Sequence, residues 1–242
     1  MAAASKEKHN VTLPEGVSLQ RLAQVLLDAW EGDPRRWMNT PAQLRENAVQ
    51  PSAPAPQDAM NLFRLLAERR VDYLLVGGMA MLTYVKGRNT KDVDLLMSVA
   101  ALEKLPELKV EDRNDLFARG KFKSIQVDLL LTSHPLFKLV EKRFVTKHPF
   151  QELAVPAATV EGIVVLKLFA LPSLYRQMEM DRVAIYETDI TMLLAHYSFD
   201  IEPLLALVEE HVEPGDKKEL RKIATECKER AAKLRRRASA SD

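Results

Sequence analysis

The chain has 242 residues, of which 47% are hydrophobic and 29% are charged, and 35 Lys and Arg against 34 Asp and Glu leave a net charge of +1. This composition is typical of a globular protein with one or two domains and excludes disordered and collagen-like chains. The single Cys227 excludes an internal disulfide and cysteine-rich metal clusters. The N-terminus lacks a secretory pattern and the longest uncharged run, Tyr73 to Val85, is too short to cross a bilayer, so we expect a soluble cytoplasmic protein.

The N-terminal region is expected to form a helical extension. Apolar residues recur at helical spacing over residues 17–30, and a Gly-Asp-Pro tripeptide then ends the pattern. Three prolines within residues 50–56 favour an extended connector. We therefore treat residues 1–56 as an N-terminal helical extension with a proline-rich linker.

The next segment predicts a helix, a strand, a glycine turn and a second helix. Apolar residues between positions 59 and 66 follow the i, i+3, i+4, i+7 pattern of a helix. The apolar run from Tyr73 to Val76 indicates a strand that ends in Gly77 and Gly78, and a helix can follow. Two glycines between a strand and a helix let a ligand approach the backbone closely, and a helix start attracts phosphate.

Two later segments predict strands that carry aspartates. In residues 92–97, the alternation of side chains places Asp92 and Asp94 on the face opposite the apolar residues. In residues 125–131, the same alternation places Asp128 opposite the apolar face. Three such carboxylates repel one another without a cation and can together bind one or two Mg²⁺ ions. Two metal ions would activate an attacking hydroxyl and hold a departing pyrophosphate.

The remaining pattern predicts the fold class. Residues 100–108 favour a helix and residues 116–123 a hairpin strand. After residue 159 the pattern is helical almost throughout, over residues 160–171, 175–196, 201–211 and 217–237. We therefore predict an α+β protein in which a small mixed-sheet domain, residues 57–150, is followed by a C-terminal helical bundle, residues 151–242. The last helix is strongly basic on one face, which suits either a solvated surface or RNA contact.

The glycine pair and the aspartates resemble the nucleotidyltransferase fold of the DNA polymerase beta superfamily. The windows Leu75-Val-Gly-Gly-Met-Ala and Gly87-Arg-Asn-Thr-Lys-Asp-Val-Asp-Leu-Leu are similar to its pattern of a glycine pair followed by Arg-x-Thr-x-Asp-x-Asp-Leu. Within the superfamily, the closest similarity is to the AbiEii-like nucleotidyltransferases, the toxin partners of abortive-infection and toxin–antitoxin pairs. A later helical motif of those families resembles residues 161–170 together with Arg182 and Asp189.

The resemblance implies a role for each matched residue. Three aspartates would be both metal ligands and catalytic residues: Asp92, Asp94 and Asp128. Seven further residues would bind the nucleotide: Gly77, Gly78, Arg88, Thr90, Lys167, Arg182 and Asp189. The implied activity is Mg²⁺-dependent transfer of a nucleoside monophosphate from a triphosphate such as ATP to an acceptor hydroxyl on RNA or protein. In a toxin–antitoxin pair, a cognate antitoxin would be a further partner; no membrane is implied.

Two other interpretations stay open. In the first, the chain is a catalytically inactive member of the fold that binds a nucleotide or a partner. In the second, it is an enzyme that modifies a small molecule such as an aminoglycoside. Each feature by itself also has a purely structural interpretation. A glycine pair is commonly only a turn, and Lys167, Arg182 and Asp189 can be ordinary charged residues on helix surfaces. Mg²⁺-dependent release of pyrophosphate separates an active enzyme from an inactive one.

Overall fold

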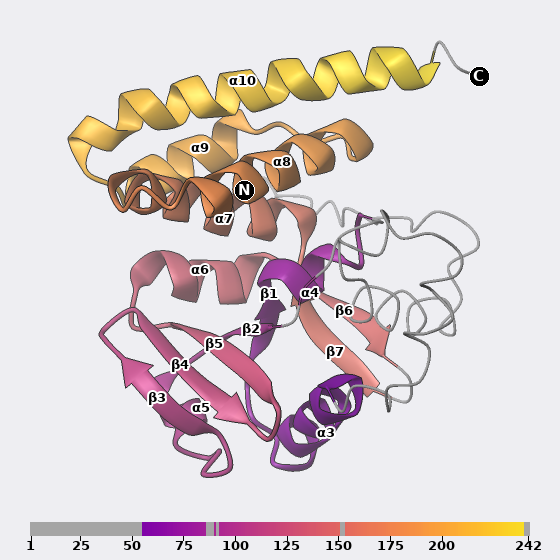
Figure 1. Ribbon diagram of the computed structural model, residues 1–242, viewed down its shortest axis with the longest axis vertical. Coiled ribbons are helices and arrows are strands. Elements are labelled where there is room, and N and C mark those ends of the chain that lie inside the picture. The colour runs from indigo at the N-terminus through magenta and orange to yellow at the C-terminus, as the bar shows by residue number, and fades with distance from the viewer. Residues whose placement is uncertain (1–54, 86–89, 91, 151–152, 240–242) are drawn as a thin grey trace, which may run out of the picture.

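The computed structural model describes residues 55–85, 90, 92–150 and 153–239. The predicted N-terminal helix, most of the proline-rich linker and Arg88 lie outside these residues. Within them the protein is α+β, with a mixed sheet followed by a helical bundle, which confirms the predicted fold class (Figure 1).

The sheet has seven strands in the order β3-β4-β5-β2-β1-β7-β6. The strands are β1 (Leu74–Val76), β2 (Val93–Met97), β3 (Lys109–Arg113), β4 (Phe117–Phe122), β5 (Ile125–Leu131), β6 (Val145–Phe150) and β7 (Leu153–Ala158). Strand β2 is antiparallel to β1 and parallel to β5, so the two aspartate strands are direct neighbours at the centre.

Along β5, buried residues alternate with half-buried ones, whereas on β2 the face of Asp94 also carries the buried Leu96. In β5 the side chains of Ile125, Val127, Leu129 and Leu131 are buried, as the sequence predicts, whereas the residues between them are half-buried. Helix α3 (Ala55–Glu68) contacts β5 and β7 and is itself well buried at its apolar positions. The core on this side leaves the aspartates on the opposite face.

Short helices connect the strands. Helix α4 (Gly77–Met81) follows β1 directly, so the predicted sequence of strand, glycine pair and helix is present. Helix α5 (Val99–Leu102) is shorter than the predicted helix over residues 100–108, because Pro106 disfavours a helical conformation at the residue before it. Helix α6 (Pro135–Arg143) begins at a proline, and the sequence analysis had not predicted it.

The β6–β7 hairpin was also not predicted, and the proposed domain boundary at residue 150 falls within it. Strand β7 pairs in parallel with β1, with Ala157 opposite Leu75, so the sheet continues to Ala158. Pro149 and Pro156 made the segment look unlike a pair of strands. Because β6 is the last strand of the sheet, its outer edge needs no ladder hydrogen bonds, and a proline is tolerated there.

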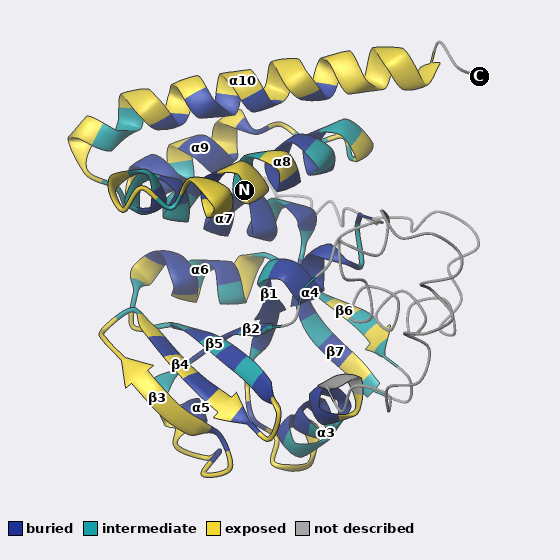
Figure 2. Ribbon diagram, in the orientation of Figure 1, coloured by how far each residue is buried: buried dark blue, intermediate teal, exposed yellow. Residues whose placement is uncertain are grey.

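The C-terminal bundle consists of α7 (Val160–Arg176), α8 (Met180–His196), α9 (Glu202–Glu209) and α10 (Pro214–Ser239). Figure 2 shows that α10 buries one side and exposes the other. Its buried stripe consists of Leu220, Ile223, Ala224, Cys227 and Ala231, and it packs mainly on α8. Among the described helices, none has both the length and the apolar composition needed to span a membrane.

Candidate active site

The glycine pair forms the start of α4, directly after β1, and packs closely against two of the predicted site residues. Gly77 has a φ of +62°, and a Cβ atom there would lie 2.1 Å from Oδ2 of Asp94. A Cβ atom on Gly78 would lie 2.6 Å from Oγ1 of Thr90. Positive φ and this close approach both require glycine at position 77. The turn is therefore fitted to its surroundings, and no side chain stands between its backbone and Asp94.

Asp94 lies on β2 directly opposite Val76, the last residue of β1. The backbone amide of Gly78 donates a hydrogen bond of 3.1 Å to its Oδ2 atom. Burial raises the pKa of Asp94 to about 6; the Gly78 hydrogen bond opposes this shift, while the charge of Asp128 adds to it. The carboxylate of Asp94 is thus held in place by the turn in surroundings that disfavour its negative charge.

The other two aspartates lie close to Asp94. Asp128 on β5 is the direct register partner of Asp94 across the parallel β2–β5 pair. Asp92 lies just ahead of β2 rather than within the strand, and its carbonyl oxygen accepts a 3.4 Å hydrogen bond from Thr90. The charge of Asp92 also raises the pKa of Asp94, although less than that of Asp128. The structure therefore brings together the three aspartates, Thr90 and the glycine turn.

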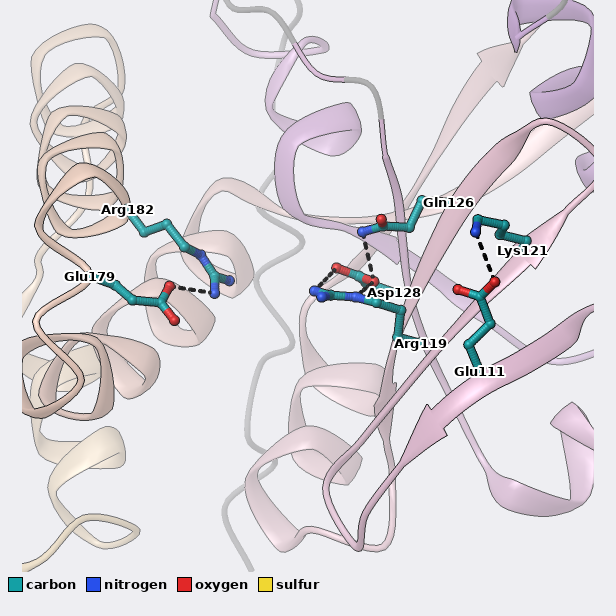
Figure 3. A network of polar contacts seen from close by, with 7 residues as sticks. All are labelled: Glu111, Arg119, Lys121, Gln126, Asp128, Glu179 and Arg182. Carbon is teal, nitrogen blue, oxygen red and sulfur yellow. Dashed lines mark hydrogen bonds and ion pairs between the residues drawn. The ribbon is translucent and has the colours of Figure 1, made fainter.

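Asp128 is engaged by an arginine that the sequence analysis did not single out. Arg119 lies opposite Asp128 on the neighbouring strand β4, and its Nε and Nη2 atoms lie 2.8 Å and 3.0 Å from the two carboxylate oxygens (Figure 3). Gln126 donates a further hydrogen bond of 3.2 Å to Oδ1. The bidentate ion pair raises the pKa of Arg119 above its ordinary value.

Lys167 and Asp189 form a buried ion pair between α7 and α8. Their side chains are 5% and 4% exposed, and Lys167 Nζ lies 2.8 Å from Asp189 Oδ2. The ammonium group also lies over the ring of Tyr186, 4.1 Å from its centroid. Lys167 lowers the pKa of Asp94, so its charge reaches the site. Lys167 is therefore a buried, paired cation, which excludes the interpretation that it is an ordinary surface lysine.

Arg182 occupies a different position. It lies on the first turn of α8, half-exposed, and its Nη1 atom donates a 2.9 Å hydrogen bond to Glu179. In Figure 3 this pair and the Arg119–Asp128 pair extend toward each other from the bundle and from the sheet. In this view the Arg182 side chain points from the bundle toward the side on which Asp128 lies, whereas Arg88 lies outside the described residues.

The donor set suits a hard divalent cation. Mg²⁺ prefers carboxylate oxygens, and the pKa of Asp94 is raised first by burial and then by the nearby charges of Asp128 and Asp92. Within the described part of the chain, however, no three Asp, Glu, His or Cys side chains stand ready as a ligand cluster. The three aspartates are the residues that would hold the ion, and Arg119 engages both carboxylate oxygens of Asp128.

Solved structures of two other proteins share part of this architecture. An antigenic nucleotidyltransferase-like protein from Paracoccidioides brasiliensis aligns over 68% of this chain and 91% of its own, with 16% identity and a TM-score of 0.43. ANT(2")-Ia, solved in complex with adenylyl-2"-tobramycin, aligns over 64% of this chain and 95% of its own, with 13% identity and a TM-score of 0.41. No family model and no curated protein matches the chain by sequence. These likenesses concern the fold alone.

Sequence reasoning missed Arg119, Gln126 and Tyr186. In β4, exposed and buried residues alternate, which places Arg119 on one face with Phe117 and Lys121. Only the pairing of β4 with β5 shows that this face continues to Asp128. Tyr186 gave no sequence signal, because its contact with Lys167 joins two helices.

Proposed function

We propose that the protein is a Mg²⁺-dependent nucleotidyltransferase that moves a nucleoside monophosphate from a triphosphate to an acceptor hydroxyl. The observation that carries this proposal is the junction of the Gly77–Gly78 turn with Asp94 and its register partner Asp128. The backbone of the glycine turn thus adjoins carboxylates of the kind that bind divalent cations. The sequence resemblance to the polymerase beta superfamily supports the same activity.

Each residue has a distinct role in this proposal. Asp92, Asp94 and Asp128 hold the cation, which supplies charge compensation at the transferred phosphoryl group when it is bound. The glycine turn and Thr90 seat the triphosphate, and Lys167 provides positive charge from the bundle side. Asp128, which is partly exposed, is in reach of solvent and can accept the proton of an acceptor hydroxyl. Arg182 and Asp189 shape the wall on the bundle side.

The test is release of pyrophosphate from each nucleoside triphosphate in the presence of Mg²⁺, EDTA or no added metal. We expect release that depends on Mg²⁺, and its loss in Asp128→Asn with retained folding by circular dichroism. Metal-independent turnover, or full activity in Asp128→Asn, contradicts the proposed mechanism. Binding of a triphosphate without any turnover, even with cell extract supplying acceptors, favours the inactive interpretation instead.

We further propose a toxin-type role with RNA or protein as the acceptor, and a cognate antitoxin as partner. The support is the similarity of residues 161–170 and of the Arg-x-Thr-x-Asp-x-Asp-Leu window to AbiEii-like nucleotidyltransferases. Incubation with each labelled triphosphate and total cell extract reveals the acceptor. Label in nucleic acid or in protein supports this role, whereas label only in small molecules favours an antibiotic-modifying activity.

A further inference from the structure

We propose that Arg119 holds Asp128 in the cation-free protein and competes with the divalent cation for that carboxylate. This inference rests on the proposed function, because it concerns the same carboxylate site. Arg119 is then a positioning residue, because it acts through Asp128. Binding of the cation requires that the Arg119–Asp128 ion pair break. The guanidinium of Arg119 is the counter-charge of the Asp128 carboxylate, and a divalent cation would replace it there.

The geometry of the pair supports this competition. Arg119 and Asp128 are direct register partners on antiparallel strands, and both carboxylate oxygens take part in the fork at 2.8 Å and 3.0 Å. Gln126 takes a second position on Oδ1. A divalent cation needs at least one of these oxygens, and the guanidinium cannot keep both once a cation of higher charge arrives.

Removing Arg119 from Asp128 requires little rearrangement. Its side chain is 52% exposed while that of Asp128 is 24% exposed, so the guanidinium can swing into solvent without opening the core. Arg119 lies on the face toward which Arg182 extends from α8 (Figure 3). A released Arg119 would thus stay beside the site, where its charge can meet a phosphate or an acceptor.

Lys121 offers a matched control on the same strand. It lies two residues further along β4 on the same face, with a side chain 57% exposed, and its Nζ atom pairs with Glu111 at 2.8 Å. Glu111 belongs to β3, at the edge of the sheet and away from the aspartates (Figure 3). Removing Lys121 therefore takes away the same unit of charge from the same face without freeing Asp128.

The experiment measures Mn²⁺ affinity by calorimetry for the full-length wild type, Arg119→Met and Lys121→Met. Mn²⁺ serves as the probe because it uses the same oxygen ligands as Mg²⁺. We expect Arg119→Met to bind Mn²⁺ about tenfold more tightly than the wild type, since the guanidinium group no longer competes with the metal ion for the Asp128 carboxylate. The Mn²⁺ affinity of Lys121→Met should stay within about twofold of the wild-type value, because Lys121 does not contact Asp128 and solvent screens its exposed charge.

Thermal melting provides the second measurement. In EDTA, Arg119→Met should melt below Lys121→Met, because its carboxylates have lost their counter-charge, and saturating Mn²⁺ should raise its melting temperature more than that of the other two proteins. Equal Mn²⁺ affinity in Arg119→Met and the wild type, weaker affinity in Arg119→Met, or no binding to either overturns the competition. Pyrophosphate release by the wild type is scored separately: its absence overturns the proposed function, while a tighter Arg119→Met still supports competition.

Discussion

Gly77 and Asp94 depend on each other at the level of single atoms. The positive φ of Gly77 turns the chain so that the amide of Gly78 points at the Asp94 carboxylate, which occupies the space that a Cβ atom would need. The surroundings of this carboxylate disfavour its charged form, because burial raises the pKa of Asp94 to about 6. A group kept at such a cost points to a functional role and not to a stabilising one.

Gly77→Ala tests the fit of the turn. We expect a loss of at least about 2 kcal/mol in the free energy of unfolding, because φ is positive and the new methyl group collides with Asp94. Gly215→Ala is the control, since nothing lies within 4 Å of a Cβ atom there, and it should change stability by less than about 1 kcal/mol. Urea denaturation measures both. Similar effects of the two substitutions would mean that the turn tolerates a side chain.

Asp94→Asn should remove activity and increase stability. The folded-state pKa of about 6 lies above the ordinary value of 3.8, so ionisation weakens folding, and stability is lost as the pH rises from about 4 to about 6. Above that window the loss amounts to about 1 to 3 kcal/mol, which the neutral Asn avoids. Urea denaturation in EDTA from pH 4 to pH 8 should show the advantage of Asp94→Asn growing through this window. A constant difference at all pH values, or retained pyrophosphate release, contradicts the assignment.

At the level of elements, the Lys167–Asp189 pair joins α7 to α8 behind the site. Both side chains are almost fully buried, so neither charge can be removed without leaving the other in a medium that solvates it poorly. The contact of Lys167 with the ring of Tyr186 adds a second link between the same two helices. The pair thus sets how the bundle presents its positive charge to the aspartates.

Lys167→Met should destabilise the protein by about 3 to 5 kcal/mol, because it strands the Asp189 carboxylate, whereas Lys167→Met combined with Asp189→Leu should recover most of that loss. Urea denaturation compares the three proteins. The double variant then isolates the role of the lysine in nucleotide binding. If it is as stable as the wild type and binds Mg-nucleotide equally well by calorimetry, Lys167 braces the helices and does not contact the triphosphate.

The elements also show what local sequence patterns can predict. The glycine turn and the apolar faces of β2 and β5 depend on neighbours along the chain, and the sequence analysis found them. Strands β6 and β7 were missed because each contains a proline that only an edge position or an irregular ladder tolerates. Arg119 could not be assigned because its role depends on which strand lies beside β5, and strand pairing is a long-range choice.

For the whole molecule, helix α10 uses its charges to hold the bundle together. Several of its basic side chains pair with carboxylates on other helices: Arg221 with Glu209, Lys228 with Glu202, and Arg230 with Glu187. Arg235 donates hydrogen bonds to three backbone carbonyl oxygens at the end of α8, those of Leu194, Ala195 and Tyr197. Carbonyl groups at a helix C-terminus lack partners within the helix, so Arg235 caps α8 from the outside.

This arrangement changes how an RNA role for α10 must be tested, because deleting the helix beyond Lys233 also removes the Arg235 cap. We expect Arg235→Gln to lower the melting temperature by about 5 °C, through loss of charge-assisted hydrogen bonds, while its exposed neighbour Arg236→Gln changes it by less than about 1 °C. Differential scanning calorimetry measures both. Equal effects of the two substitutions would show that the cap contributes nothing.

The double variant Lys233→Gln with Arg236→Gln then removes exposed charge while leaving Arg235 and the buried stripe intact. We expect it to bind bulk tRNA with the same affinity and the same dependence on salt as the wild type, because the basic side chains Arg221, Lys228, Arg230 and Arg235 are already directed at carboxylates and carbonyl groups of the bundle. Each phosphate contact that is lost lowers the slope of log affinity against log salt by about 0.9 for a duplex, so even one contact is measurable. A titration across a salt series with both proteins gives this slope. A fall of one or two units would assign the RNA acceptor to this end of α10, whereas equal slopes would exclude Lys233 and Arg236 from RNA binding and favour the surface around Arg119 and Arg182.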